Sequence, residues 1–160
     1  MHKIIANTTP IIALAEINQL DLLEKLYGTI LIPQAVYDEI KTEHIRNQVQ
    51  NASWIQIKAV SDNSQRDIFN ARLHAGEVEV IILSKEIGAD LAIIDDNTAK
   101  KTAKYLEIPV TGTLGVLLRA KREGYIDRVS PLLDELVLNG FYISDEIRKY
   151  ALEAAKELVE

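Results

Sequence analysis

Polar side chains that could bind a metal ion follow two apolar segments of this sequence. Asn7 comes directly after the short apolar run of residues 3–6, and Asp95 and Asp96 follow the apolar run of residues 91–94. If both runs are strands of a parallel sheet, their carboxyl ends lie at the same edge, where the binding sites of such sheets form. We therefore expect these three side chains to lie close together.

Two glutamates extend this candidate cluster. Glu77 falls in the first turn of an expected helix, and Glu39 lies on the helix after the second expected strand. Carboxylates placed close together repel one another unless cations occupy the site, and Mg²⁺ or Mn²⁺ prefers such oxygen ligands. One or two of these ions can activate water and stabilise the charge of a phosphodiester during its cleavage.

Each carboxylate also has a purely structural interpretation. Glu77 could complement a helix dipole, Glu39 could be a solvated helix residue, and Asp96 could cap the helix that follows it. For the pair Asp95 and Asp96, capping and metal binding are equally open. Only the combination of these residues favours a metal site.

Basic residues that could contact a phosphate backbone form two clusters. The chain has 18 Lys and Arg against 24 Asp and Glu, a net charge of −6, so it is not a globally basic nucleic-acid binder. Any such contact must therefore be local. The clusters are Lys100, Lys101 and Lys104 on one expected helix and Arg119, Lys121 and Arg122 on another. Solvated helix faces are the alternative interpretation of both.

Apolar segments and helical patterns alternate along the chain, which predicts a three-layer α/β/α fold around a mainly parallel sheet. The expected strands are residues 3–6, 29–32, 54–57, 91–94 and 109–111. The expected helices begin near residues 8, 20, 33, 76, 98, 112, 130 and 144. Residues 43–52 are polar and predict a loop, and residues 62–65 predict a turn.

The length of 160 residues suffices for one compact domain without disulfides, and the chain has no Cys. We expect a single domain over residues 1–160, with a core of about residues 1–143 and a C-terminal helix of about residues 144–159. No apolar run suits a signal peptide or a membrane span, so we expect a soluble cytoplasmic protein. The C-terminal helix could dock on the core or form a subunit interface through an apolar stripe. That stripe consists of Ile147, Ala151, Ala154 and Leu158.

Five blocks of the sequence resemble, in the same order, blocks of the PIN-domain superfamily. They are IANTTPIIALA at residues 5–15, IPQAVYDEI at 32–40, GEVEVI at 76–81, IDD at 94–96 and TGTLG at 111–115. More narrowly, they are similar to a prokaryotic branch of PIN-like proteins related to toxin–antitoxin ribonucleases of the VapC type. The resemblance covers residues 4 to about 143.

The resemblance implies an endoribonuclease that cleaves single-stranded RNA with Mg²⁺ or Mn²⁺. It implies metal ligands at position 7, Glu39, Glu77 and Asp96, with Asp95 as an adjacent catalytic group. Where PIN domains have Asp, this chain has Asn7, whose amide oxygen can bind a metal but brings no charge. The resemblance also implies a small antitoxin-like inhibitor protein that covers the acidic groove, and we expect a homodimer.

The departure at Asn7 keeps a second hypothesis open. In it, the chain is a PIN-like module that has lost catalysis and binds RNA or a protein partner. A third hypothesis, a phosphorylated receiver domain, is weaker because the acidic pair of that fold follows the first strand. Here Asp95 and Asp96 follow a late strand.

Small residues near the cluster are expected to act structurally. Thr8 or Thr9 is expected to cap the helix that starts there. The turn around Gly112 could hold a phosphate at a helix N-terminus, but we expect this glycine to serve close packing.

Overall fold

The computed structural model of the chain describes residues 2–61, 64, 66–70 and 72–158. Five parallel strands form one sheet in the order β3-β2-β1-β4-β5. The strands are β1 (Ile4–Ala6), β2 (Ile30–Pro33), β3 (Ile55–Lys58), β4 (Leu91–Ile93) and β5 (Val110–Thr111). Each lies where the sequence predicts a strand, so the expected parallel sheet is confirmed.

The strand β1 is the centre of the sheet and the point at which the strand order reverses. It pairs with β2 on one side and with β4 on the other, so that Ile5 lies opposite Leu31 and Ala92. The residues of β1 are at most 4% exposed, because helices cover both faces of the sheet. The carboxyl ends of β1 and β4 therefore form the switch point of the sheet, where ligands of such folds bind.

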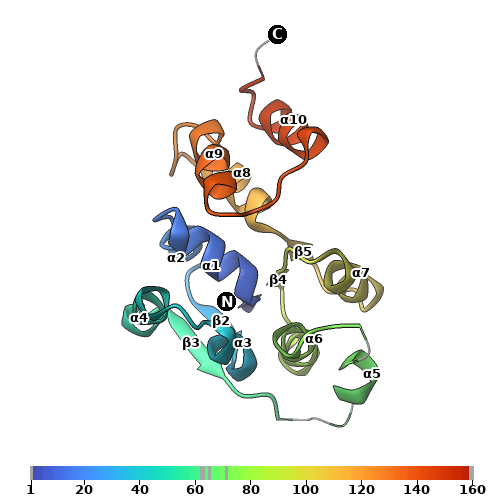
Figure 1. Cartoon of the computed structure of the whole chain (residues 1–160). Helices are drawn as coiled ribbons and strands as arrows, with labels where there is room; N and C mark the ends of the chain where they lie inside the picture. The colour runs from blue at the N-terminus through green and yellow to red at the C-terminus, as the bar shows by residue number, and fades with distance from the viewer. Residues whose placement is uncertain (1, 62–63, 65, 71, 159–160) are drawn as a thin grey trace.

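Ten helices are described. They are α1 (Thr8–Glu16), α2 (Leu22–Tyr27), α3 (Gln34–Glu39), α4 (Glu43–Asn51), α5 (Arg66–Asn70), α6 (Ala75–Ile87), α7 (Asn97–Tyr105), α8 (Thr113–Arg122), α9 (Ser130–Leu138) and α10 (Asp145–Ala154). Helices α1, α2 and α4 lie on one side of the sheet, and α6 and α7 lie on the other (Figure 1). The three-layer α/β/α architecture is therefore confirmed. None of the described helices combines the length and the apolar character that a membrane crossing requires.

The prediction of a loop at residues 43–52 is wrong, because α4 occupies most of this segment. Ile45 and Val49 of α4 are 1% and 3% exposed. They are four residues apart and form a narrow apolar stripe on an otherwise polar helix. This stripe lets α4 pack beside α1, and tertiary packing stabilises a helix that its local pattern hardly indicates. The turn expected at residues 62–65 falls mostly outside the described residues.

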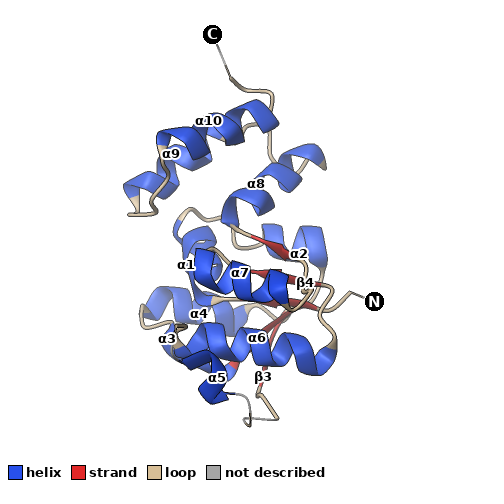
Figure 2. Ribbon diagram, turned by 90° about the vertical axis from the view of Figure 1, so that its right-hand side faces the viewer, coloured by secondary structure: helices blue, strands red, loops and turns tan. Residues whose placement is uncertain are grey.

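Helices α8, α9 and α10 lie together beyond one end of the α/β layers (Figure 2). The hydroxyl of Ser144 accepts a hydrogen bond from the Ile147 backbone N–H at 3.2 Å, so Ser144 caps α10. The helix ends at Ala154, earlier than the expected end near residue 159. Beyond it, the carboxylate of Glu157 accepts hydrogen bonds from backbone N–H groups at the start of α9, at 2.7 and 3.0 Å.

The expected apolar stripe docks only in part on the core, and its last member, Leu158, lies beyond the end of α10. Ala151 is 1% exposed, whereas Ile147 is 47% and Leu158 is 39% exposed. Ala154 is also exposed. Because α10 packs chiefly against α8, only the small residue at the centre of the stripe is covered.

Candidate functional site

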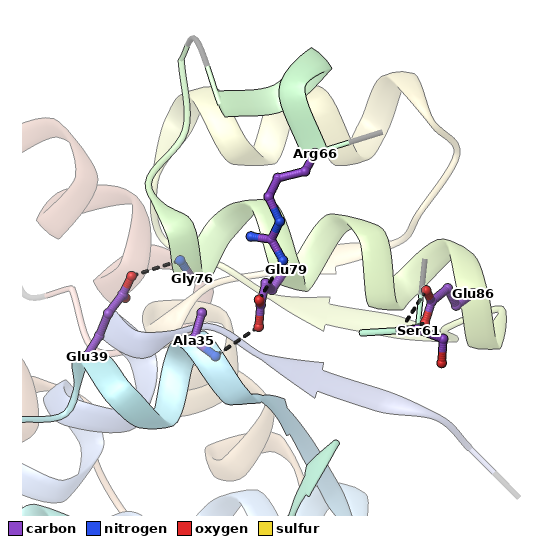
Figure 3. Close-up of polar contacts among 7 residues, drawn as sticks. All are labelled: Ala35, Glu39, Ser61, Arg66, Gly76, Glu79 and Glu86. Carbon is purple, nitrogen blue, oxygen red and sulfur yellow. Dashed lines mark hydrogen bonds and ion pairs between the residues drawn. The ribbon is translucent and has the colours of Figure 1, made fainter. Parts of the chain in front are cut away.

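Glu39 connects three elements at the carboxyl edge of the sheet. It ends α3, and its carboxylate accepts hydrogen bonds from Thr8 Oγ1 at 2.6 Å and from the Gly76 backbone N–H at 2.8 Å. Figure 3 shows this carboxylate directed at the start of α6. A Cβ atom at Gly76 would lie 2.6 Å from Glu39 Oε2, so the glycine permits the close approach. The expectation that Thr8 or Thr9 caps α1 is wrong, because the N-cap residue is Asn7 and Thr8 donates to Glu39 instead.

Glu77 lies buried in the first turn of α6. Its side chain is 8% exposed and accepts a hydrogen bond from the His74 backbone N–H at 2.9 Å. Burial raises the pKa of Glu77, and the negative charges of Asp96 and Glu39 add to the rise, against the lowering effect of the hydrogen bond from His74. The charges of Asp96 and Glu39 therefore act on the Glu77 carboxyl group at the switch point.

Asn7 presents a buried oxygen atom to the same edge. The residue is 3% exposed, and its backbone N–H donates to the Ile93 carbonyl at 2.9 Å. Its side-chain Oδ1 is fully buried and accepts no hydrogen bond from any described residue. A buried acceptor without a partner costs roughly 1–3 kcal/mol of folding free energy. A cation or a hydrogen-bond donor that binds this oxygen would remove that cost.

The adjacent residues Asp95 and Asp96 accept hydrogen bonds from different helices. Asp95 accepts hydrogen bonds from the Thr113 backbone N–H at 2.8 Å and from Thr113 Oγ1 at 2.6 Å. Asp96 Oδ2 accepts from the Ala99 backbone N–H at 2.9 Å and caps α7. A Cβ atom at Gly112 would lie 2.7 Å from Asp95 Oδ1, which confirms that this glycine serves close packing.

Sequence reasoning missed the two residues that hold carboxylates from a distance. Gly76 binds Glu39 across 37 positions, and Thr113 binds Asp95 across 18 positions. The available signal was a small residue at the start of each helix, next to an expected site residue or strand end. Such a signal indicates a close approach but does not say which side chain approaches.

The acidic cluster consists of oxygen donors, the ligand type that Mg²⁺ and Mn²⁺ prefer. Within residues 2–61, 64, 66–70 and 72–158, no three His, Cys, Asp or Glu side chains converge closely enough to form a metal-holding group by themselves. The unpartnered oxygen of Asn7 and the raised pKa of Glu77 are both features that a divalent cation would relieve. The donor chemistry thus fits such an ion, although the carboxylates are directed at hydrogen-bond donors of the protein.

The first basic cluster begins near this edge. The Nζ atom of Lys100 would lie 3.1 Å from a Cβ atom at Gly112, beside Asp95. Lys101 and Lys104 are exposed on α7. The structure therefore brings one member of this cluster to the acidic edge.

The second basic cluster lies at the far end of α8, roughly 10 Å along the helix from its start. The guanidinium group of Arg119 lies over the ring of Tyr27, 4.9 Å from its centre. Lys121 Nζ pairs with Glu157 at 2.9 Å, and Arg122 is exposed. The structure does not bring this cluster to the acidic edge.

The fold and the site together define a doubly wound, parallel α/β protein whose switch point is acidic. A family model described as a PIN domain matches residues 3–157. The chain belongs to this family of PIN domains, which have a nuclease-type function, bind nucleic acid and generally depend on divalent metal ions. Neither a search of curated proteins nor a search of solved structures gave a match.

Proposed function

We propose that the protein is an endoribonuclease that requires Mg²⁺ or Mn²⁺ and cleaves single-stranded RNA. The observation that carries this proposal is the buried, unpartnered Oδ1 of Asn7 at the edge where Glu77 feels the charges of Asp96 and Glu39. An edge that combines an orphaned oxygen acceptor with mutually repelling carboxylates is more stable when a cation is bound.

The proposed metal ligands are Asn7, Glu39, Glu77 and Asp96. A bound ion supplies an acidified water molecule and neutralises charge on the phosphate. The rest of the site orients these ligands. Thr8 and the Gly76 backbone hold the Glu39 carboxylate, and the His74 backbone holds that of Glu77.

Asp95 has a separate proposed role, as a further ligand or as the group that orients the attacking water. Its two hydrogen bonds to Thr113 fix the carboxylate, and Lys100 lies beside it. Lys100 is the basic residue best placed to contact a phosphate of the bound RNA.

The proposal is tested with the purified protein, Mn²⁺ and a labelled single-stranded RNA. We expect millimolar Mn²⁺ to raise the melting temperature and to permit cleavage, and we expect chelation to abolish both effects. Glu77→Gln should remove both, because the amide brings no charge. Glu135→Gln, at an exposed position of α9, is the matched control and should behave as the wild type. If Mn²⁺ neither stabilises the wild type nor supports cleavage of RNA, the proposal is wrong.

A second candidate function is a binding module without catalysis. The observation that favours it is that each carboxylate of the cluster already accepts a hydrogen bond from the protein. Asn7→Asp separates the two candidates, because it restores the missing charge. If the wild type cleaves no RNA and Asn7→Asp cleaves it with Mn²⁺, the natural protein is a binding module. Cleavage by the wild type excludes this candidate.

The remaining expectations from the sequence and from the family resemblance stay predictions. They are a toxin role, an antitoxin-like inhibitor protein, a homodimer and a cytoplasmic location. Co-expression with a neighbouring small reading frame, followed by a growth assay, would test the first two.

A further inference from the structure

A groove leads from the acidic edge of the sheet to the C-terminal helices. Its volume is about 840 Å³, within the range of roughly 300–1,000 Å³ that is typical of ligand clefts. Asp95 and Lys100 line it from one side, together with Gly112 at the start of α8. Tyr142 and Tyr150 line it from the C-terminal segment. The groove therefore joins an ionic side next to the proposed catalytic centre with an aromatic side.

The two tyrosines are large apolar surfaces that the core of the protein does not use. Tyr142 is 86% and Tyr150 is 67% exposed. Ile147 lies in the same groove and is 47% exposed. Exposed aromatic rings that gather in one groove are platforms on which the flat faces of nucleobases can stack.

The ionic side of the groove supplies a cation for a phosphate. Lys100 Nζ and Asp95 Oδ1 would both touch a Cβ atom at Gly112, at 3.1 and 2.7 Å, so the glycine leaves room for both groups at one point. In the part of the chain that the structure describes, no carboxylate forms an ion pair with Lys100. Because the net charge of the protein is −6, such a local cation is what a polyanion needs to approach this edge.

We infer that this groove binds unpaired nucleotides of single-stranded RNA beside the bond to be cleaved, with bases on Tyr142 and Tyr150 and a phosphate on Lys100. The inference rests on the proposed function for the identity of the nucleic acid. Asp95 belongs both to the acidic cluster and to the groove, so RNA bound at the cluster continues into the groove. A duplex keeps its bases stacked on one another and cannot offer their faces to tyrosine rings.

The test measures binding alone, so that it does not depend on cleavage. A fluorescein-labelled twelve-nucleotide oligoadenylate is titrated with the full-length protein in EDTA, and its fluorescence anisotropy gives the affinity. We expect Tyr142→Ala and Tyr150→Ala each to weaken binding at least 5-fold, and Tyr142→Phe and Tyr150→Phe to bind as the wild type does. Tyr105→Ala is the matched control, because Tyr105 is 87% exposed on α7 and does not line the groove. A duplex of the same length should bind more weakly and should not respond to the tyrosine substitutions.

The other outcomes decide separately about the inference and about the proposed nuclease. Equal affinities of Tyr142→Ala, Tyr150→Ala and Tyr105→Ala, or no binding of the wild type to the oligonucleotide at low salt, would show that the groove does not hold bases. If Tyr142→Ala leaves RNA affinity unchanged but dissociates a dimer in sedimentation, the groove is an interface between two copies. Tyrosine-dependent binding without any Mn²⁺-dependent cleavage would reject the proposed nuclease and leave only the base-binding role of the groove. If the wild type cleaves RNA but its RNA affinity does not depend on either tyrosine, the nuclease proposal stands and the inference about the groove is wrong.

Discussion

Substitution of Thr113 by Val tests how Asp95 is held at the acidic edge. Thr113 is fully buried, and its hydroxyl donates to Asp95 Oδ2 at 2.6 Å. Valine has nearly the shape of threonine and keeps the backbone N–H that donates to Asp95 Oδ1. The substitution therefore removes one hydrogen bond to a charged group and changes little else.

The expected loss follows from that single bond. A hydrogen bond to a charged group contributes about 1.5–3 kcal/mol, and in a protein of this size 1 kcal/mol shifts the melting temperature by about 2–4 °C. Thr113→Val should thus lower the free energy of unfolding by about 1.5–3 kcal/mol and the melting temperature by roughly 3–12 °C. Urea and thermal denaturation measure the two quantities.

Thr113→Ser is the control, because it keeps the hydroxyl and loses only a methyl group. We expect it to cost less than Thr113→Val, about 1 kcal/mol. If Thr113→Val costs under 0.5 kcal/mol, a value below the range for any typical hydrogen bond, the hydroxyl does not hold Asp95. The reasoning also fails if Thr113→Ser costs as much as Thr113→Val.

Three further substitutions test other contacts of the site and the C-terminal segment. Gly76→Ala would place Cβ 2.6 Å from Glu39 Oε2, so we expect it to break the contacts of Glu39. The higher helix propensity of alanine offsets part of that loss, and the expected net destabilisation in thermal denaturation is about 1 kcal/mol. A net stabilisation would contradict this prediction. Burial raises the pKa of Glu77, so its ionisation costs stability as the pH rises through that pKa, and Glu77→Gln without metal should be more stable than the wild type at pH 8 but not at pH 4. Equal stability curves against pH would refute the prediction. Burial alone would raise the pKa of Glu157, but hydrogen bonds from the backbone of Val129 and Ser130 and from Lys121 hold it below its ordinary value of 4.5. The ionised Glu157 carboxylate therefore contributes its full stabilisation above pH 4.5, and this stabilisation is lost as the pH falls through the lower folded pKa. Glu157→Gln should thus destabilise the protein at pH 7 and should not do so in acid. A loss of stability that does not depend on pH would speak against an ionic role of Glu157.

Much of the fold could be predicted because its signals are local. The buried strand β1 is an uninterrupted apolar run, Gly88 with a φ of 64° terminates α6, and Ser144 caps the start of α10. Helix α4 was missed because its stripe has only two apolar residues, Ile45 and Val49. What stabilises this helix is its neighbour α1, which no pattern within residues 43–51 can reveal.

The types of the site residues were a property of the sequence, since oxygen-bearing side chains followed strand ends and helix starts. Their partners were decided by tertiary structure. Asp95 and Asp96 are adjacent in the chain, yet one binds the start of α8 and the other caps α7. Likewise, the sequence offered two basic clusters as equals, and only the fold brings Lys100 to the acidic edge and turns Lys121 to Glu157. The physical reason is that apolar periodicity and caps act over a few residues, whereas a charge or a hydrogen-bond donor acts on whatever group the folded chain brings beside it.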